Sequence, residues 1–236
     1  MVQYYKSDEG YYYLNKINLK SDQDLYKPEC IEFSFFKFGV KKILNKYSKL
    51  LTEMITKEFV IDSNTWLIAS RANFIHDYVA GSISDVLAKN VAKNLNLKHV
   101  ISCPTIDLKK DVNYSKLNSF EDRKREIGKR KYLLHFSENI DLKNKNVIFI
   151  DDIINTGITI QTIHNSFKKY KIKRFEVCTV AKLLAPTPEF EYKLSRIILD
   201  KKFKNKNLNL LKKLFSKSEL IVTHKFLKIL KIELKW

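Results

Sequence analysis

The chain has 236 residues, of which 44% are hydrophobic, which suits one α/β domain with additions or a core plus a small second lobe. No stretch approaches the roughly 18 apolar residues of a membrane-spanning helix, and the first residues do not resemble a signal peptide. The three cysteines are far apart and the five histidines lack ligand spacing, which argues against a disulfide framework or a structural zinc site. We therefore expect a cytoplasmic protein with no membrane partner.

The formal net charge is +18, from 44 basic and 26 acidic residues. Such an excess attracts polyanions, so nucleic acid bound through a basic surface is one interpretation. Biased amino-acid usage is the other. Only six of the 44 basic residues are arginine, and Lys, Asn, Ile, Tyr and Phe are abundant beside 5 glycines and 4 prolines, as in proteins of AT-rich genomes. Composition leaves both interpretations open.

The first 62 residues form an N-terminal extension that is a candidate hood over a site. Five tyrosines lie between residues 4 and 13, and we expect them to pack against a neighbouring element rather than stack on bases. Residues 31–38 (IEFSFFKF) alternate in polarity, which predicts a strand, whereas residues 42–59 carry apolar side chains at helical spacing.

A β-α-β unit follows. Residues 65–69 (TWLIA) predict a buried strand, residues 83–95 an amphipathic helix, and residues 99–102 (HVIS) a short strand that Pro104 should end. Such units normally form a parallel pair of strands with a right-handed crossover.

Residues 105–146 are the most polar part of the chain. The segment from Arg123 to Lys131 is rich in basic residues and contains Gly128. It suits either a mobile flap that closes on an anion or a solvated helix of mixed charge.

The most informative segment is 147–160, VIFIDDIINTGITI. Four consecutive apolar residues predict a strand buried on both faces, with Asp151 and Asp152 at its end. A polar turn at residues 155–159 then leads into a helix, which is indicated by the spacing of Ile160, Ile163 and Phe167.

This segment predicts a site for a ribose 5-phosphate. Gly157 permits positive φ and a close approach of the backbone. The hydroxyls of Thr156 and Thr159, with the free amides at the helix start, would cradle a phosphate. Asp151 and Asp152 would repel that phosphate but suit vicinal ribose hydroxyls and a Mg²⁺ ion held partly through water. The alternative is that the two aspartates merely cap the helix.

Beyond the central helix, residues 175–180 (FEVCTV) predict another strand, and Pro186 and Pro188 end the core pattern. We divide the chain into the extension at 1–62, a core at 63–186 and a basic C-terminal extension at 187–236. The last eleven residues interleave basic and apolar side chains. They suit an edge strand, an amphipathic helix or a partner-binding tail.

Segment 147–160 resembles the phosphoribosyl pyrophosphate (PRPP) motif of type I phosphoribosyltransferases: a hydrophobic strand, two acids, two variable residues, then Thr-Thr-Gly-x-Thr or a close relative. The order of elements from residue 65 to 186 also fits, about half the chain. The resemblance implies an α/β, Rossmann-like core, a parallel sheet flanked by helices, with N- and C-terminal additions. It further implies a Mg²⁺-dependent enzyme of nucleotide metabolism, as in purine salvage. Such an enzyme, usually a homodimer, transfers the phosphoribosyl group of PRPP to a nucleobase or related acceptor and releases pyrophosphate.

By this resemblance Asp151 and Asp152 are catalytic residues that hold the ribose hydroxyls and the metal. The 5′-phosphate is bound by the turn, whose residues are Asn155, Thr156, Gly157, Ile158 and Thr159. Pyrophosphate is bound by Ser70 and Arg71 in the loop after the first core strand. The flap corresponds to residues 105–140, where Arg123, Lys124, Arg125, Lys129 and Arg130 are in reach of the pyrophosphate. Among these we assign catalysis to Arg123 and Arg125 and pyrophosphate binding to Lys129 and Arg130.

The acceptor is less clearly indicated. DDIINTG is similar to the EDIIDTG of hypoxanthine-guanine phosphoribosyltransferases, but Asn155 replaces their second aspartate and cannot take a proton. Lys182 falls near the lysine that contacts the purine in those enzymes, or is one more surface lysine. The competence protein F family also has a similar motif and basic loop, and its link to DNA would give the +18 charge a purpose, but its cysteine-rich zinc module is lacking. A PRPP-binding regulator without transferase activity is a further alternative.

Overall fold

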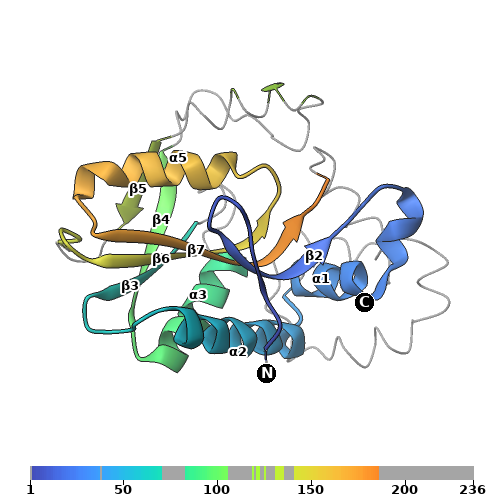
Figure 1. Cartoon of the computed structure of the whole chain (residues 1–236), viewed down its shortest axis with the longest axis horizontal. Coiled ribbons are helices and arrows are strands. Elements are labelled where there is room, and N and C mark those ends of the chain that lie inside the picture. Colours follow the sequence, from blue (N-terminus) through green and yellow to red (C-terminus); the bar gives the residue numbers. More distant parts are fainter. Residues whose placement is uncertain are drawn as a thin grey trace, which may run out of the picture.

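The computed structural model describes residues 2–37, 39–70, 83–105, 119, 121–122, 125, 131–135 and 141–185. These residues form a three-layer α/β arrangement around a seven-stranded sheet of order β1-β2-β7-β6-β3-β4-β5 (Figure 1). The strands are β1 (Tyr5–Lys6), β2 (Tyr12–Ile17), β3 (Thr65–Ser70), β4 (Lys98–Thr105), β5 (Lys131–His135), β6 (Asn146–Ile154) and β7 (Arg174–Leu183). The five inner strands are mutually parallel, and β1 and β5 are antiparallel at the two edges.

Helices cover both faces of this sheet. Helix α5 (Ile158–Phe167) lies on one face, and α1 (Pro28–Lys37), α2 (Lys41–Glu58) and α3 (Ile83–Leu95) lie on the other (Figure 1). Short 3₁₀ helices, η1 (Asp22–Tyr26) and η3 (Lys168–Tyr170), adjoin α1 and α5. This is the α/β core with a largely parallel sheet flanked by helices that the sequence predicts. None of the helices in the described ranges is long and apolar enough to cross a membrane.

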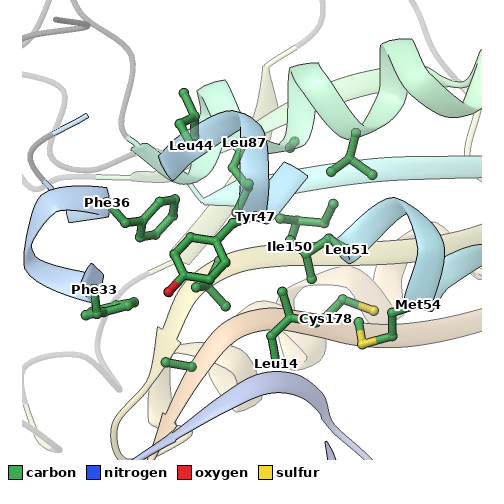
Figure 2. Packing of buried hydrophobic residues seen from close by; sticks show 14 of the residues in the cluster. Leu14, Phe33, Phe36, Leu44, Tyr47, Leu51, Met54, Leu87, Ile150 and Cys178 are labelled. Carbon is green, nitrogen blue, oxygen red and sulfur yellow. The ribbon is translucent and has the colours of Figure 1, made fainter. Parts of the chain in front are cut away.

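Strand β6 separates two hydrophobic clusters. Ile148 and Ile150 face the cluster formed with α1, α2 and α3, part of which is shown in Figure 2, whereas Val147 and Phe149 face the cluster formed with α5. All four side chains are at most 2% exposed. A strand buried on both faces has no polar alternation. Four apolar residues in a row therefore predict such a strand correctly.

Most of the predicted elements are confirmed. The helices expected at 42–59 and 83–95 are α2 and α3, and the strands expected at 65–69 and 175–180 are β3 and β7. The strand expected to stop at Pro104 instead continues to Thr105 as β4. Among the residues that the structure describes, β4 beyond Ser102, which pairs with Ser70, has only β5 as a neighbour. A strand paired on one side tolerates a missing amide N–H, so proline fits there.

The strand predicted at 31–38 does not form over residues 31–37, because residues 28–37 form helix α1. Its ends carry strong helix signals: Pro28 is the first residue, and Gly39 follows the last turn with φ of +75°. The amides of Gly39 and Val40 donate to the carbonyls of Phe36 and Phe35, which is the Schellman pattern of a helix C-terminus. These end signals outweigh a short alternation.

The N-terminal tyrosines pack into the sheet, as expected. Strand β2 pairs in parallel with β7, and Tyr12 and Tyr13 are each 5% exposed. Tyr5 of β1 stacks on Tyr13 with ring centroids 5.5 Å apart. The N-terminal extension therefore continues the sheet of the core. The divisions at residues 62 and 186 and the hood role stay predictions, and the C-terminal extension lies outside the described residues.

Candidate active site

The two aspartates lie where β6 loses one of its neighbours. Pairing between β3 and β6 ends at Ala69 and Ile150, whereas pairing between β6 and β7 continues to Ile154. Asp151 and Asp152 are thus the first residues of β6 beyond the β3 pairing, although the strand does not end at them as expected. Ligands of open α/β sheets bind at such carboxyl ends of strands.

The carboxyl group of Asp151 is held from within the protein. Its Oδ1 atom accepts hydrogen bonds of 2.9 Å from the hydroxyl of Ser84, in the first turn of α3, and from the backbone amide of Asp152. Burial of the carboxyl, followed by the negative charge of Asp152, raises the pKa of Asp151 to about 7. A bound cation or hydroxyl donor would favour the charged carboxylate.

Asp152 has a cationic partner that the sequence did not indicate. Its Oδ2 atom accepts a hydrogen bond from the Nζ of Lys37, the last residue of α1. Asp152 is only 8% exposed, so this ion pair is largely shielded from solvent. The partner is 115 positions away, and the alternation of its segment predicts a strand instead of a helix. No local signal in the sequence therefore indicates this contact.

The turn after β6 contains a glycine in the left-handed region. Gly157 is the N-cap of α5 with φ of +75° and ψ of −7°, a region that L side chains rarely adopt. The hydroxyl of Thr156 accepts a 3.3 Å hydrogen bond from the amide of Ile158. Because the N-cap is Gly157, the alternative in which the aspartates cap this helix is wrong.

A tyrosine of the N-terminal extension adjoins the same turn. A Cβ atom added at Gly157 would lie 3.9 Å from Cε2 of Tyr11. Tyr11 is partly buried against the cluster that includes Ile160 and Phe167 of α5. The Tyr11 ring therefore flanks the start of the helix.

Lys182 lies near the end of β7, opposite Ile154 of β6. Its ammonium is 3.1 Å from Oε2 of Glu9, in the turn between β1 and β2. Hydrogen bonds from Ser7, from the backbone and from Lys182 lower the pKa of Glu9 to about 2. The candidate base-binding lysine is thus ion-paired to the N-terminal extension.

The remaining predicted site residues are only partly described. Ser70 ends β3 and pairs with Ser102, but its side chain lies outside the described residues, as do Arg71, Arg123, Lys124, Lys129 and Arg130. Within the region predicted to be a flap, Arg125 donates a 2.7 Å hydrogen bond to Asp122, with the arginine side chain 65% exposed. Strand β5, within the predicted flap region, was not expected.

The acidic pair offers oxygen ligands of the kind that Mg²⁺ takes. Across the described ranges there is no group of three or more His, Cys, Asp or Glu residues that could hold a metal ion. Mg²⁺ commonly keeps several waters and is bound through one or two carboxylates plus substrate phosphates. Asp151 and Asp152 provide two such carboxylates.

Residues 71–210 match the phosphoribosyl transferase domain family. The matched segment covers more than half of the chain and includes the acidic pair, the glycine turn and the basic segment from Arg123 to Lys131. The chain belongs to the phosphoribosyl transferase family. The resemblance drawn from segment 147–160 is thereby confirmed, and the protein is a phosphoribosyltransferase.

Solved structures of phosphoribosyltransferases are also similar. A hypoxanthine-guanine phosphoribosyltransferase of Bacillus anthracis is 20% identical, with 60% of this chain and 69% of that chain covered and a TM-score of 0.42. A hypoxanthine phosphoribosyltransferase of Staphylococcus aureus is 16% identical (60% and 64% covered, TM-score 0.39). A purine phosphoribosyltransferase of Pyrococcus horikoshii is 14% identical (62% and 84% covered, TM-score 0.35). No curated protein sequence matches the chain. The family assignment rests on the family match alone.

Proposed function

We propose that this phosphoribosyltransferase binds PRPP with Mg²⁺ and transfers the 5-phosphoribosyl group to a nucleobase or related acceptor, with release of pyrophosphate. One observation carries the proposal. Two adjacent carboxylates at the end of β6 are followed by a glycine with positive φ that begins helix α5. Acceptors for sugar hydroxyls therefore adjoin a backbone cradle for a phosphate.

The 5′-phosphate binds at the start of α5. The first amides of a helix have no partner within the helix and point toward its N-terminal end, where the helix dipole favours an anion. Residues 155–159 form this cradle, in which Thr156 and Thr159 add hydroxyl donors. Gly157 keeps the backbone accessible because it has no side chain.

The ribose binds at the acidic pair. Carboxylates accept hydrogen bonds, so Asp151 and Asp152 together suit the two vicinal hydroxyls of the ribose. Ser84 donates to one oxygen of Asp151, which orients this carboxyl group. Binding is favoured where Asp151 is charged, at and above about pH 7.

The leaving pyrophosphate is bound by the loop at Ser70 and Arg71 and by the basic residues of the flap. Arg123 and Arg125 are suited to bidentate contacts with phosphate oxygens, and Lys129 and Arg130 add charge. Asp151 and Asp152 would hold Mg²⁺, which would neutralise negative charge on the leaving group. The basic side chains of the loop and the flap would stabilise charge separation as the C1–O bond breaks in an oxocarbenium-like transition state, and flap closure would exclude water.

The acceptor is bound on the β7 side of this site. Lys182 donates a hydrogen bond to an exocyclic oxygen of the base. Asn155 offers hydrogen bonds but no proton acceptor of useful basicity, so attack by the acceptor nitrogen does not use residue 155 as a base. Cytoplasmic location, a homodimer and a nucleic-acid partner for the basic surface stay predictions. The family match does not favour a regulator or a DNA-associated protein without transferase activity.

The test is release of pyrophosphate from PRPP and Mg²⁺ with a panel of purine and pyrimidine bases. We expect release with at least one base, and loss of release in the double variant Asp151→Asn with Asp152→Asn. Asp141→Asn is the matched control, because Asp141 precedes β6 in an exposed turn. Full activity in the double variant would refute the site. No release with any acceptor, together with salt-sensitive binding of single-stranded DNA, would refute the transferase proposal.

A further inference from the structure

Lys37 is the one described cation that contacts the acidic pair, and it comes from outside the family match at residues 71–210. Its ammonium donates to Oδ2 of Asp152, and the two side chains are 20% and 12% exposed. No role in the proposed transfer has so far been given to this residue. Its position raises the question of what a lysine does at a carboxylate that would face the ribose.

Helix α1 holds Lys37 in a fixed place. Phe33 and Phe36 on its inner face are at most 1% exposed, and Phe36 packs edge-on against Tyr47 of α2 with ring centroids 5.2 Å apart (Figure 2). The Schellman pattern after Phe36 fixes the end of the helix. Lys37 is therefore attached to the buried layer of helices, unlike a surface lysine whose side chain is free to move.

The same layer positions both carboxyl groups. Ser84 of α3 donates to Asp151, and Lys37 of α1 donates to Asp152. Two adjacent buried carboxylates repel each other, and an ammonium in hydrogen-bond contact offsets much of that repulsion. Asp152 keeps a second oxygen, Oδ1, with which it can accept a ribose hydroxyl.

We propose that Lys37 is a positioning residue for PRPP, which orients and neutralises Asp152 so that the acidic pair binds the ribose. This inference rests on the proposed function. Its consequence is that the PRPP site is completed by the N-terminal extension, through α1, and is not formed by the matched segment alone.

The experiment measures PRPP binding by calorimetry in the presence of Mg²⁺, together with KM for PRPP and kcat. We expect Lys37→Gln to raise Kd and KM for PRPP about tenfold with a much smaller change in kcat, and Lys37→Arg to restore most of the affinity. Lys46→Gln is the control, because Lys46 forms an exposed ion pair with Glu32 between the same two helices; it should leave both constants unchanged. A purely structural lysine would change thermal stability without this selective effect on KM.

The variant Lys37→Gln leaves Asp152 without its lysine partner. A double-mutant cycle separates the loss of this contact from misfolding of the variant. In the Asp152→Asn background, Lys37→Gln should cause no further loss of PRPP affinity, whereas additive losses would show that Lys37 acts elsewhere. Wild-type PRPP affinity in Lys37→Gln, or tighter binding, would overturn the positioning role; tighter binding would mean that the lysine competes with the metal. If wild-type protein does not bind PRPP, the proposed function fails and this inference fails with it. If the wild type binds and the variant binds equally, only the inference fails.

Discussion

Replacing Asp151 by asparagine should inactivate the enzyme and yet stabilise the fold at and above neutral pH. The pKa of Asp151 is raised from 3.8 to about 7, mainly by burial and by the charge of Asp152. Between pH 3.8 and about 7, Asp151 is therefore protonated in the folded protein but ionised in the unfolded chain. The stability associated with the protonated carboxyl is fully present below about pH 4 and is lost as pH rises to about 7.

The magnitude follows from the size of the shift. One pKa unit corresponds to about 1.4 kcal/mol, so a shift of about three units sets an upper limit of about 4 kcal/mol. Asparagine keeps a side-chain oxygen that can accept the hydrogen bonds from Ser84 and from the amide of Asp152. We therefore expect the two proteins to be about equally stable near pH 4, and Asp151→Asn to be more stable by up to several kcal/mol near pH 8.

Urea unfolding at a series of pH values from about 4 to about 8 measures this difference directly. Asp141→Asn serves as the control, since Asp141 is exposed and its replacement should give a difference that does not change with pH. The reasoning is refuted if Asp151→Asn is less stable than the wild type near pH 8, or if their difference is independent of pH.

Two further substitutions test the cradle and the acceptor side. Gly157→Ala should raise KM for PRPP several-fold, because alanine at φ of +75° costs about 1–2 kcal/mol and places a methyl group in the cradle. Gly10→Ala carries the same backbone strain at φ of +86° in open space, so an equal effect of both substitutions on KM would contradict the cradle. Lys182→Gln should raise KM for the acceptor more than KM for PRPP, as measured in steady-state kinetics with each substrate varied. Lys16→Gln on β2, opposite Lys182, should change neither constant, and a matching effect at Lys16 would argue for a general charge effect instead.

The local part of the site could be predicted because one continuous segment encodes it. Residues 147–160 contain a doubly buried strand, two acids, a glycine turn and a helix stripe, and each of these has a signal within a few positions. The contacts that these residues make with distant parts of the chain have no such signal. Ser84 reaches Asp151 across 67 positions, and only the packing of α3 against the sheet brings the two together.

Short sequence patterns mislead where they conflict with longer-range context. The alternation of residues 31–38 predicts a strand. Pro28 and Gly39, however, mark the two ends of a helix of 10 residues. Pro104 was expected to end a strand, but an edge segment of β4 with one neighbour tolerates it. In the first case the residues that flank the segment decide its structure, and in the second case the strands beside it do.

The N-terminal extension contacts each predicted subsite that the structure describes at side-chain level. Lys37 binds Asp152 at the ribose site, Tyr11 flanks Gly157 at the phosphate cradle, and Glu9 pairs with Lys182 at the acceptor side. These contacts come from a hairpin and a helix that are far apart within the extension, so they do not depend on a single local feature. Because strand β2 also pairs with β7, the same residues that stabilise the edge of the sheet lie beside the residues proposed to select the acceptor. Acceptor specificity should therefore depend on residues before the family match as well as on those within it.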